Sequence, residues 1–146
     1  MVPYTLFYDN GLLKESGQLV NGYADGYYYK FLESGEKFRE HFLREGKPHG
    51  VQKWYSEGKL HYTETFVNGV RDGKAVSYNP RCGYVEEEGI YENNMKEGLW
   101  YIYEKENLFM VELYKKDSLI KILYRNPQIE KKSYTLEDAP PLNDDC

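Results

Sequence analysis

Histidine, cysteine and serine are the residue types most often used in catalysis and metal binding, and here they form no motif that predicts either. His41, His49 and His61 make no HExxH motif and occupy unrelated positions in the chain. Cys82 and Cys146 form no CxxC pair, which indicates neither a zinc site nor a disulfide framework. No serine lies in a nucleophile elbow, and no glycine pattern resembles a phosphate-binding loop. We therefore expect no enzyme activity, no metal and no cofactor.

Carboxylates are plentiful, and one run of them is a candidate binding site. The chain has 24 Asp and Glu residues, whose spacing marks no pair for general acid and base catalysis. Glu86, Glu87 and Glu88 are consecutive. Because neighbouring residues of a strand point to opposite faces, at least one of the three must share a face with the aromatic core. We expect this run to receive a lysine or arginine of a partner; the alternative is an ordinary solvated surface.

Regularly spaced glycines indicate the elements that must position these residues. Turn positions come in pairs eleven residues apart, and a repeat glycine follows the second member of each of the first four pairs after four residues. The repeat glycines Gly26, Gly50, Gly73 and Gly98 give a period of 23 to 25 residues. Gly and Asn tolerate positive φ, so the spacing predicts turns. The pairs are Gly11 and Gly22, Gly35 and Gly46, Gly58 and Gly69, Gly83 and Asn94, and, in a degenerate fifth copy, Asn107 and Ser118.

The segments between these turns predict β-strands, because they are too short for helices and rich in Tyr, Phe, Val, Leu and Thr. Three columns of equivalent apolar positions predict a core face that continues from repeat to repeat. We expect an all-β fold: a single-layer, meandering antiparallel sheet of about five β-hairpin repeats, similar to a solenoid. The columns are Phe31, Tyr55, Tyr78 and Tyr103; Leu19, Leu43, Phe66 and Tyr91; and Leu13, Leu60, Val85 and Phe109, with Lys37 as the one misfit.

Three aromatic residues lie out of phase with these columns. Trp54 is four residues after its repeat glycine, and Tyr28 and Trp100 are each two residues after theirs. Out-of-phase rings should stand on the opposite face of the sheet, where Tyr and Trp are typical anchors for a partner. The alternative is that a one-layer sheet needs rings on both faces. Tyrosine suits such a sheet, since its ring buries apolar area while its hydroxyl stays in water, and the chain has 16 of them.

Composition sets the domain boundaries and the class of partner. Residues 1–125 form the expected repeat domain, and residues 126–146 form an acidic C-terminal cap or tail. The net charge of -5 disfavours nucleic acid and anionic membranes and favours a basic protein; the alternative is that the charge only keeps the protein soluble. The N-terminal residues do not resemble a signal peptide, and no segment approaches the roughly 20 apolar residues of a membrane span. We expect a cytoplasmic protein that is a monomer when free.

Segments 46–50 (GKPHG), 54–60 (WYSEGKL) and 66–73 (FVNGVRDG) resemble MORN repeats. They are most similar to the MORN-variant repeats of bacterial antitoxins of the YwqK type, and the resemblance covers roughly residues 8–118. Segment 79–83 departs from the pattern by lengthening a turn, and the fifth copy departs by losing its glycines. The resemblance implies a meandering antiparallel sheet and, in that bacterial family, neutralisation of a toxin by binding it.

The sequence therefore predicts an antitoxin or immunity protein that binds a cognate, basic toxin. The predicted contact residues are Tyr28, Trp54, Trp100, Glu86, Glu87 and Glu88. The alternative is a MORN-repeat scaffold or adaptor that binds other proteins or membrane-proximal partners.

Overall fold

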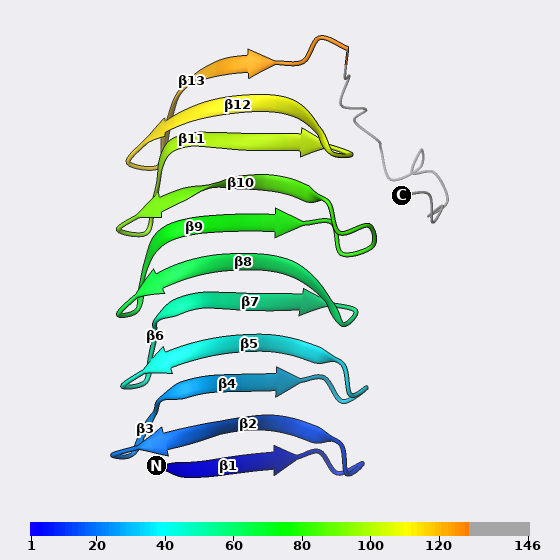
Figure 1. The fold of residues 1–146 in the computed structure, drawn as a ribbon, viewed down its shortest axis with the longest axis vertical. Helices are drawn as coiled ribbons and strands as arrows, with labels where there is room; N and C mark the ends of the chain where they lie inside the picture. The colour runs from blue at the N-terminus through cyan, green and yellow to red at the C-terminus, as the bar shows by residue number, and fades with distance from the viewer. Residues whose placement is uncertain (129–146) are drawn as a thin grey trace.

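The computed structural model describes residues 1–128, which form an all-β protein (Figure 1). No helix is present in this range, so none could span a membrane. The expected C-terminal cap or tail begins at residue 126, and most of it lies outside the described residues. The strands are β1 (Val2–Phe7), β2 (Leu13–Val20), β3 (Tyr23–Ala24), β4 (Gly26–Phe31), β5 (Lys37–Arg44), β6 (Lys47–Pro48), β7 (Gly50–Ser56), β8 (Lys59–Val67), β9 (Val70–Tyr78), β10 (Val85–Glu92), β11 (Met95–Glu104), β12 (Asn107–Lys115) and β13 (Ser118–Arg125).

All of these strands belong to one open antiparallel sheet, in which each strand pairs with its neighbours in the sequence. The order is β1-β2-β4-β5-β7-β8-β9-β10-β11-β12-β13, and the short strands β3 and β6 extend the pairing of β2 and β5. The strands are stacked in chain order, with β1 at one end and β13 at the other. The prediction of a single-layer, meandering sheet of hairpins is confirmed.

Two-residue turns connect most strands. Both central residues of these turns adopt positive φ. Val20 pairs with Tyr23 across Asn21-Gly22, and Val67 pairs with Val70 across Asn68-Gly69. This is the hairpin geometry whose twist matches that of the flanking strands.

In the fifth repeat the predicted turn positions are wrong by one residue. The turns lie at Lys105-Glu106 and Lys116-Asp117, all four residues having positive φ, so that Asn107 and Ser118 already belong to strands. Glu106 and Asp117 keep the eleven-residue spacing. The register moves with the turn: Leu108 pairs with Tyr103 as Leu60 pairs with Tyr55, so Leu108 and not Phe109 belongs to the third apolar column.

The repeat glycines bend strands instead of closing loops. Gly26, Gly50, Gly73 and Gly98 all have positive φ, between 71° and 123°. In the first two repeats the bend separates β3 from β4 and β6 from β7, whereas β9 and β11 continue through it. A side chain at Gly73 would be unfavourable for two reasons. Its Cβ atom would lie only 3.0 Å from Thr65, and a residue with a side chain would be strained at this positive φ.

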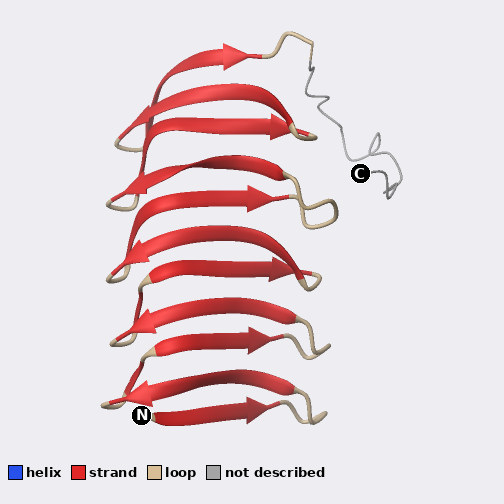
Figure 2. Cartoon of the chain, viewed as in Figure 1, coloured by secondary structure: helices blue, strands red, loops and turns tan. Residues whose placement is uncertain are grey.

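The tight turns that join one repeat to the next are stacked along one side of the sheet (Figure 2), and hydrogen bonds join them. In four of these turns the second residue donates its N–H to a carbonyl two residues before the previous repeat glycine, at 2.8 to 2.9 Å. The residue just before the repeat glycine often accepts a second bond from the next turn: Asp25 from the Glu45 N–H, and Glu97 from the Lys116 N–H. At the same position His49 accepts the Asn68 N–H through Nδ1. The donors and acceptors of the first set are Gly46 to Ala24, Gly69 to Pro48, Asn94 to Arg71 and Asp117 to Lys96.

The predicted single core face is wrong, because its columns divide between the two faces. Gly50 pairs with Phe66, so Tyr55, five residues after Gly50, points away from the face of Phe66. Accordingly the Tyr55 hydroxyl donates to Glu40, while the adjacent Trp54 contacts other residues on the opposite face. The deepest positions are two residues after the repeat glycine, where Gln52, Ala75 and Trp100 are 0%, 1% and 3% exposed. Most other apolar side chains are half-buried, as a single layer requires.

The longest connection within the described residues joins β9 to β10, as the sequence indicated. Asn79 organises it, since its side-chain oxygen accepts the N–H groups of Arg81 and Cys82, each at 3.0 Å. Cys82 is disulfide-bonded, so the expectation that the cysteines form no disulfide is wrong. The loop places Tyr84 and the glutamates that follow at the end of β10.

Candidate functional site

One face of the sheet carries a row of aromatic rings that crosses most of the strands; we call it the ladder face. Cross-strand pairing creates it, because Tyr28 faces His41, and Trp54 faces Tyr62, on neighbouring strands. The ladder residues are Tyr28, His41, Trp54, Tyr62, Tyr91, Trp100 and Tyr114.

The N-terminal half of the ladder is a chain of ring contacts. The centroids of Tyr28 and His41 are 6.3 Å apart, those of His41 and Trp54 4.8 Å, and those of Trp54 and Tyr62 5.7 Å. Burial raises the pKa of Tyr28 to about 12, helped by the adjacent Glu15 carboxylate. Burial also lowers the pKa of His41 to about 4, helped by the charge of Arg39. At neutral pH these rings are therefore uncharged packing groups.

The C-terminal half of the ladder is covered by cations. The Trp100 ring lies 5.2 Å from Tyr91 and 6.4 Å from Tyr114, between centroids. The Lys96 ammonium group lies 4.2 Å from the centroid of Trp100, and the Arg71 guanidinium group lies 4.2 Å from that of Tyr91. Trp100 also lies against Gly89 of β10, where a Cβ atom would overlap the indole ring. A lysine above and a glycine beside it thus bury Trp100 almost completely.

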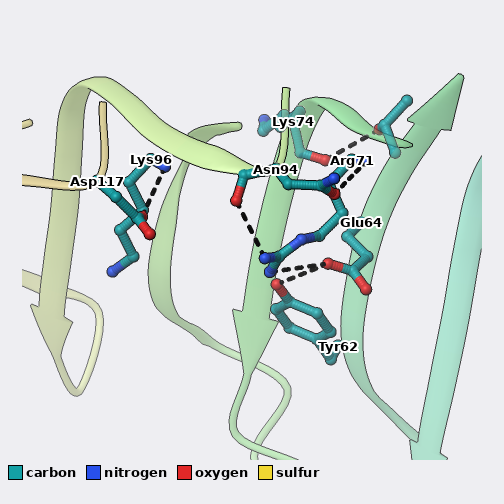
Figure 3. A network of polar contacts seen from close by, with 8 residues as sticks. Tyr62, Glu64, Arg71, Lys74, Asn94, Lys96 and Asp117 are labelled. Atoms are coloured by element: carbon teal, nitrogen blue, oxygen red, sulfur yellow. Dashed lines mark hydrogen bonds and ion pairs between the residues drawn. The ribbon is translucent and has the colours of Figure 1, made fainter. Parts of the chain in front are cut away.

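A polar network joins the ladder to the turn stack (Figure 3). The Tyr62 hydroxyl donates to Glu64 at 3.3 Å, and Arg71 Nη1 lies 3.9 Å from the same carboxylate oxygen. Arg71 also donates its backbone N–H and its Nη2 to Asn94 of the next turn. Burial raises the pKa of Glu64, although the charge of Arg71 opposes the shift. The network fixes Arg71 over Tyr91 and leaves it little freedom to bind a partner.

An acidic hollow of about 390 Å³ lies beside the ladder at the ends of β10 and β11. Glu86, Glu87 and Glu104 line it together with the rings of Tyr84 and Tyr103, and Lys105 is the one cation in its lining. Burial raises the pKa of Tyr84, and the negative charges of Glu86 and Glu104 raise it further. The three groups therefore interact electrostatically.

The carboxylates of the acidic hollow differ in their partners. Glu87 forms an ion pair with Lys96 at 3.0 Å, and this contact raises the pKa of Lys96 against the opposing effect of burial. Glu86 accepts only a neutral hydrogen bond, from Asn79 at 3.0 Å. Within residues 1–128 no cation forms an ion pair with Glu86 or Glu104. Two carboxylates of the hollow are therefore available to a cation from outside.

A smaller hollow of about 80 Å³ continues the acidic hollow onto the ladder face, since both are lined by Ser77 and Glu87. Trp100 lines the smaller hollow. Its indole Nε1–H is buried and has no hydrogen-bond acceptor among the described residues.

The three aromatic residues predicted to contact a partner differ in their exposure to solvent. Trp54 and Tyr28 are half-buried on the ladder face, but Trp100 is 3% exposed, so the expectation of an exposed Trp100 anchor is wrong. The reason is that Gly89 has no side chain, which lets the indole pack closely against β10.

The acidic run is also divided. Glu87 lies on the ladder face with Lys96, whereas Glu88 lies on the other face, where Tyr103 donates to it at 3.1 Å and Lys74 lies 3.8 Å away. Glu86 lies at a bulge near the start of β10, where the pairing of β10 with β9 shifts. Glu86 and Glu87 therefore line one hollow, and Glu88 does not.

Several residues of the site carried no signal in the sequence. Glu104 comes from β11 and reaches Glu86 only through the pairing of that strand with β10. Lys96 and Tyr114 were not singled out, because their closeness to Trp100 depends on strand register. If the register of the strands were known, the positions of Trp54 and Trp100 would indicate which rings of the neighbouring strands lie beside them.

No protein-family model matches this chain. No curated protein is significantly similar to it either. The likeness to MORN-variant repeats therefore remains an expectation from the sequence, and the chemistry of the site has to be read from its geometry.

That geometry offers groups suited to binding. The three histidines have separate contacts. His41 packs in the ladder, His49 accepts a hydrogen bond from a turn, and His61 Nδ1 lies 3.2 Å from the carbonyl of Tyr78. Among residues 1–128 no group of three or more His, Cys, Asp or Glu side chains is arranged to hold a metal ion. The acidic hollow and the ladder beside it can recognise a cation attached to an apolar or aromatic surface.

Proposed function

We propose that this chain is an antitoxin or immunity protein that neutralises a basic bacterial toxin by binding it in a one-to-one complex. The observation that carries the proposal is the acidic hollow, in which Glu86 and Glu104 have no cationic partner among the described residues. A lysine or arginine of the toxin enters this hollow, and the tyrosine rings around it contact the aliphatic part of that side chain.

The ladder face provides the remaining contact area. Half-buried Tyr28 and Trp54 supply rigid aromatic surface at low entropic cost, which is typical of protein interfaces. The net charge of -5 speeds encounter with a basic partner and disfavours binding to phosphate backbones. Neutralisation then results from occlusion of the toxin, with no covalent step.

A second function, that of a scaffold or adaptor, is favoured by one observation. Among residues 1–128, both terminal strands of the sheet have an unpaired edge and exposed apolar side chains, including Val2 and Phe7 of β1 and Ile120 of β13. Open edges pair readily with other chains. A scaffold of this kind would bind several partners or assemble with itself.

The test is affinity purification of the tagged chain from its native host at moderate salt, with the stoichiometry of the purified material determined by light scattering. The proposal predicts one basic protein in equal amount, which arrests growth when expressed alone and is harmless when expressed with this chain. Several substoichiometric partners, or lipid without protein, would contradict it and favour the scaffold.

A further inference from the structure

The face of the sheet opposite the ladder carries an exposed apolar stripe, which we call the reverse stripe. Alternation places it there, because Tyr27 and Leu99 each precede a residue of the ladder. Four of its side chains are large, apolar and between 41% and 58% exposed, and contiguous surface of this kind marks an interaction site. The stripe takes one residue from each strand between β4 and β11: Tyr27, Phe42, Val51, Thr65, Lys74, Ile90 and Leu99.

A hollow of about 410 Å³ lies at one end of the reverse stripe. Its apolar lining comes from Ile90, Leu99 and Tyr101. Gly89 and Gly98 also line it, and neither has a side chain that could fill the space. The hollow can therefore receive a large apolar side chain.

The other end of the reverse stripe carries such a side chain. Tyr27 is 58% exposed. Its ring lies edge-on to Phe42, with the centroids 5.2 Å apart, and stacks on Tyr29 at 6.1 Å. These neighbours hold the Tyr27 ring in place, so little side-chain entropy is lost when it enters an apolar site.

Charge gives no preference for a strongly basic or acidic occupant. Lys74 is the one charged residue of the reverse stripe, and it already forms an ion pair with Glu88 at 3.8 Å. Glu97, the other carboxylate that lines the hollow, accepts the Lys116 N–H at 2.8 Å. An apolar surface with a projecting ring at one end and a hollow at the other is complementary to a reversed copy of itself.

We infer that two copies of this chain pack reverse stripe against reverse stripe in opposite strand order, with the Tyr27 ring of each copy in the hollow of the other. Thr65 is the middle residue of the stripe, so a two-fold axis near it brings Tyr27 over Leu99 and Lys74 over Val51. The same strand order in both copies would instead place Lys74 against Lys74, which is unfavourable.

The area of the reverse stripe is sufficient for a dimer. The stripe spans seven neighbouring strands. At about 4.8 Å per spacing it is about 29 Å long, and with one row of side chains on each side it is about 20 Å wide, so that each copy would bury roughly 600 Å². A specific interface needs about 1,000 Å² in total, or about 500 Å² per copy.

This dimer goes beyond the proposed function and is compatible with it. The lining of the acidic hollow contains no residue of the reverse stripe, so each copy can still bind one basic partner. A closed pair also differs from the open-ended assembly that pairing of sheet edges would give. The proposal replaces the free monomer expected from the sequence.

The test is sedimentation velocity of the full chain, in which the disulfide of Cys82 stays in place. We expect a reversible dimer with a dissociation constant in the micromolar range or below. Tyr27→Lys and Leu99→Glu should each weaken it by about tenfold or more, because a charge then enters an apolar contact. Leu12→Lys, at an exposed position outside the stripe, should leave it unchanged.

Mixing the two variants tests the contact itself. In a mixed pair the new lysine at position 27 of one copy faces the new glutamate at position 99 of the other, while the unsubstituted Tyr27 and Leu99 meet at the second contact. Native mass spectrometry should therefore show a heterodimer in excess over both homodimers.

A chain that stays monomeric would overturn the proposal, as would a dimer that neither substitution weakens or a mixture without heterodimer. A dimer that only reducing agent dissociates would be linked through cysteine and would overturn it too. If either variant does not fold, Tyr27→Ser, which removes the ring without adding a charge, decides the question by the same sedimentation measurement.

Discussion

Trp100 is the most closely packed residue of the site. Its ring contacts Gly89 of the neighbouring strand β10 and Lys96 of its own strand β11. The absence of a side chain at Gly89 lets the indole pack against β10, and Lys96 then lies over the ring and pairs with Glu87. A buried tryptophan in a sheet with so few buried residues contributes a large share of the apolar contact. The pairing of Glu87 with Lys96, and so one wall of the acidic hollow, depends on this arrangement.

Gly89→Ala tests this dependence. The added methyl would overlap indole ring atoms, while the backbone of Gly89 needs no positive φ, so the effect is purely steric. We expect the free energy of unfolding to fall by about 1–3 kcal/mol, the usual cost of overpacking, measured by urea denaturation. Gly17→Ala is the matched control: its methyl would lie 3.0 Å from the Tyr4 hydroxyl near the edge of the sheet, and we expect a smaller loss. Equal stability of Gly89→Ala and the unsubstituted protein would contradict the packing described.

His41 makes stability depend on pH. Burial, with help from Arg39, lowers its pKa to about 4 in the folded protein, against about 6.5 when unfolded. The unfolded chain therefore binds more protons between these values, and stability falls as pH falls from about 6.5 to 4. Because His41 keeps some contact with solvent, we expect a loss of about 1 kcal/mol between pH 7 and pH 5.

The measurement is the urea midpoint as a function of pH. His41→Gln should flatten the profile in that window, whereas His61→Gln, at an exposed position, should leave it as it is. A profile that His41→Gln does not change would refute the assignment.

At the scale of elements, paired positive-φ turns and bent strands determine the repeat. The turn stack links each hairpin to the next through bonds such as Gly46 N–H to the Ala24 carbonyl, so every repeat stabilises its neighbours directly. The same bends bring Gln52, Ala75 and Trp100 to equivalent, buried positions.

Much of this was predictable, because glycine and asparagine mark positive φ in the first four repeats. The fifth was misplaced since Lys105, Glu106, Lys116 and Asp117 adopt positive φ without being typical of it; Lys116 and Asp117 are held by bonds to Glu97 and Lys96. The division of the columns between two faces was not predictable either, because it depends on which residue of β8 faces Gly50.

The turn at Lys105-Glu106 offers a test of this account. Asn-Gly adopts the required positive φ at much lower cost than Lys-Glu. We expect Lys105→Asn/Glu106→Gly to raise the free energy of unfolding by about 1 kcal/mol. Asn21→Lys/Gly22→Glu, the reverse exchange at another two-residue turn with positive φ, should lower it by a similar amount in the same urea assay. If both exchanges moved stability in the same direction, the turn assignment would be incorrect.

At the scale of the whole molecule, residues 1–128 form one thin sheet with two large faces and few buried residues. This sheet offers a long surface on which aromatic rings and carboxylates are held at fixed spacing. The sequence predicted this architecture and drew attention to Glu86 and Glu87, whose binding role stays a prediction. It could not predict that Glu104 joins Glu86, since their closeness arises only when β10 and β11 pair.

The central claim is that a basic partner binds at the acidic hollow, and the dissociation constant of the purified complex tests it most directly. Glu86→Gln/Glu104→Gln removes two charges from the hollow, and Glu33→Gln/Glu92→Gln removes two from exposed positions elsewhere. At about 0.15 M salt the account predicts at least tenfold weaker binding for the first variant, as expected for loss of charged pairs, and little change for the second. Equal dissociation constants for the two variants would contradict it.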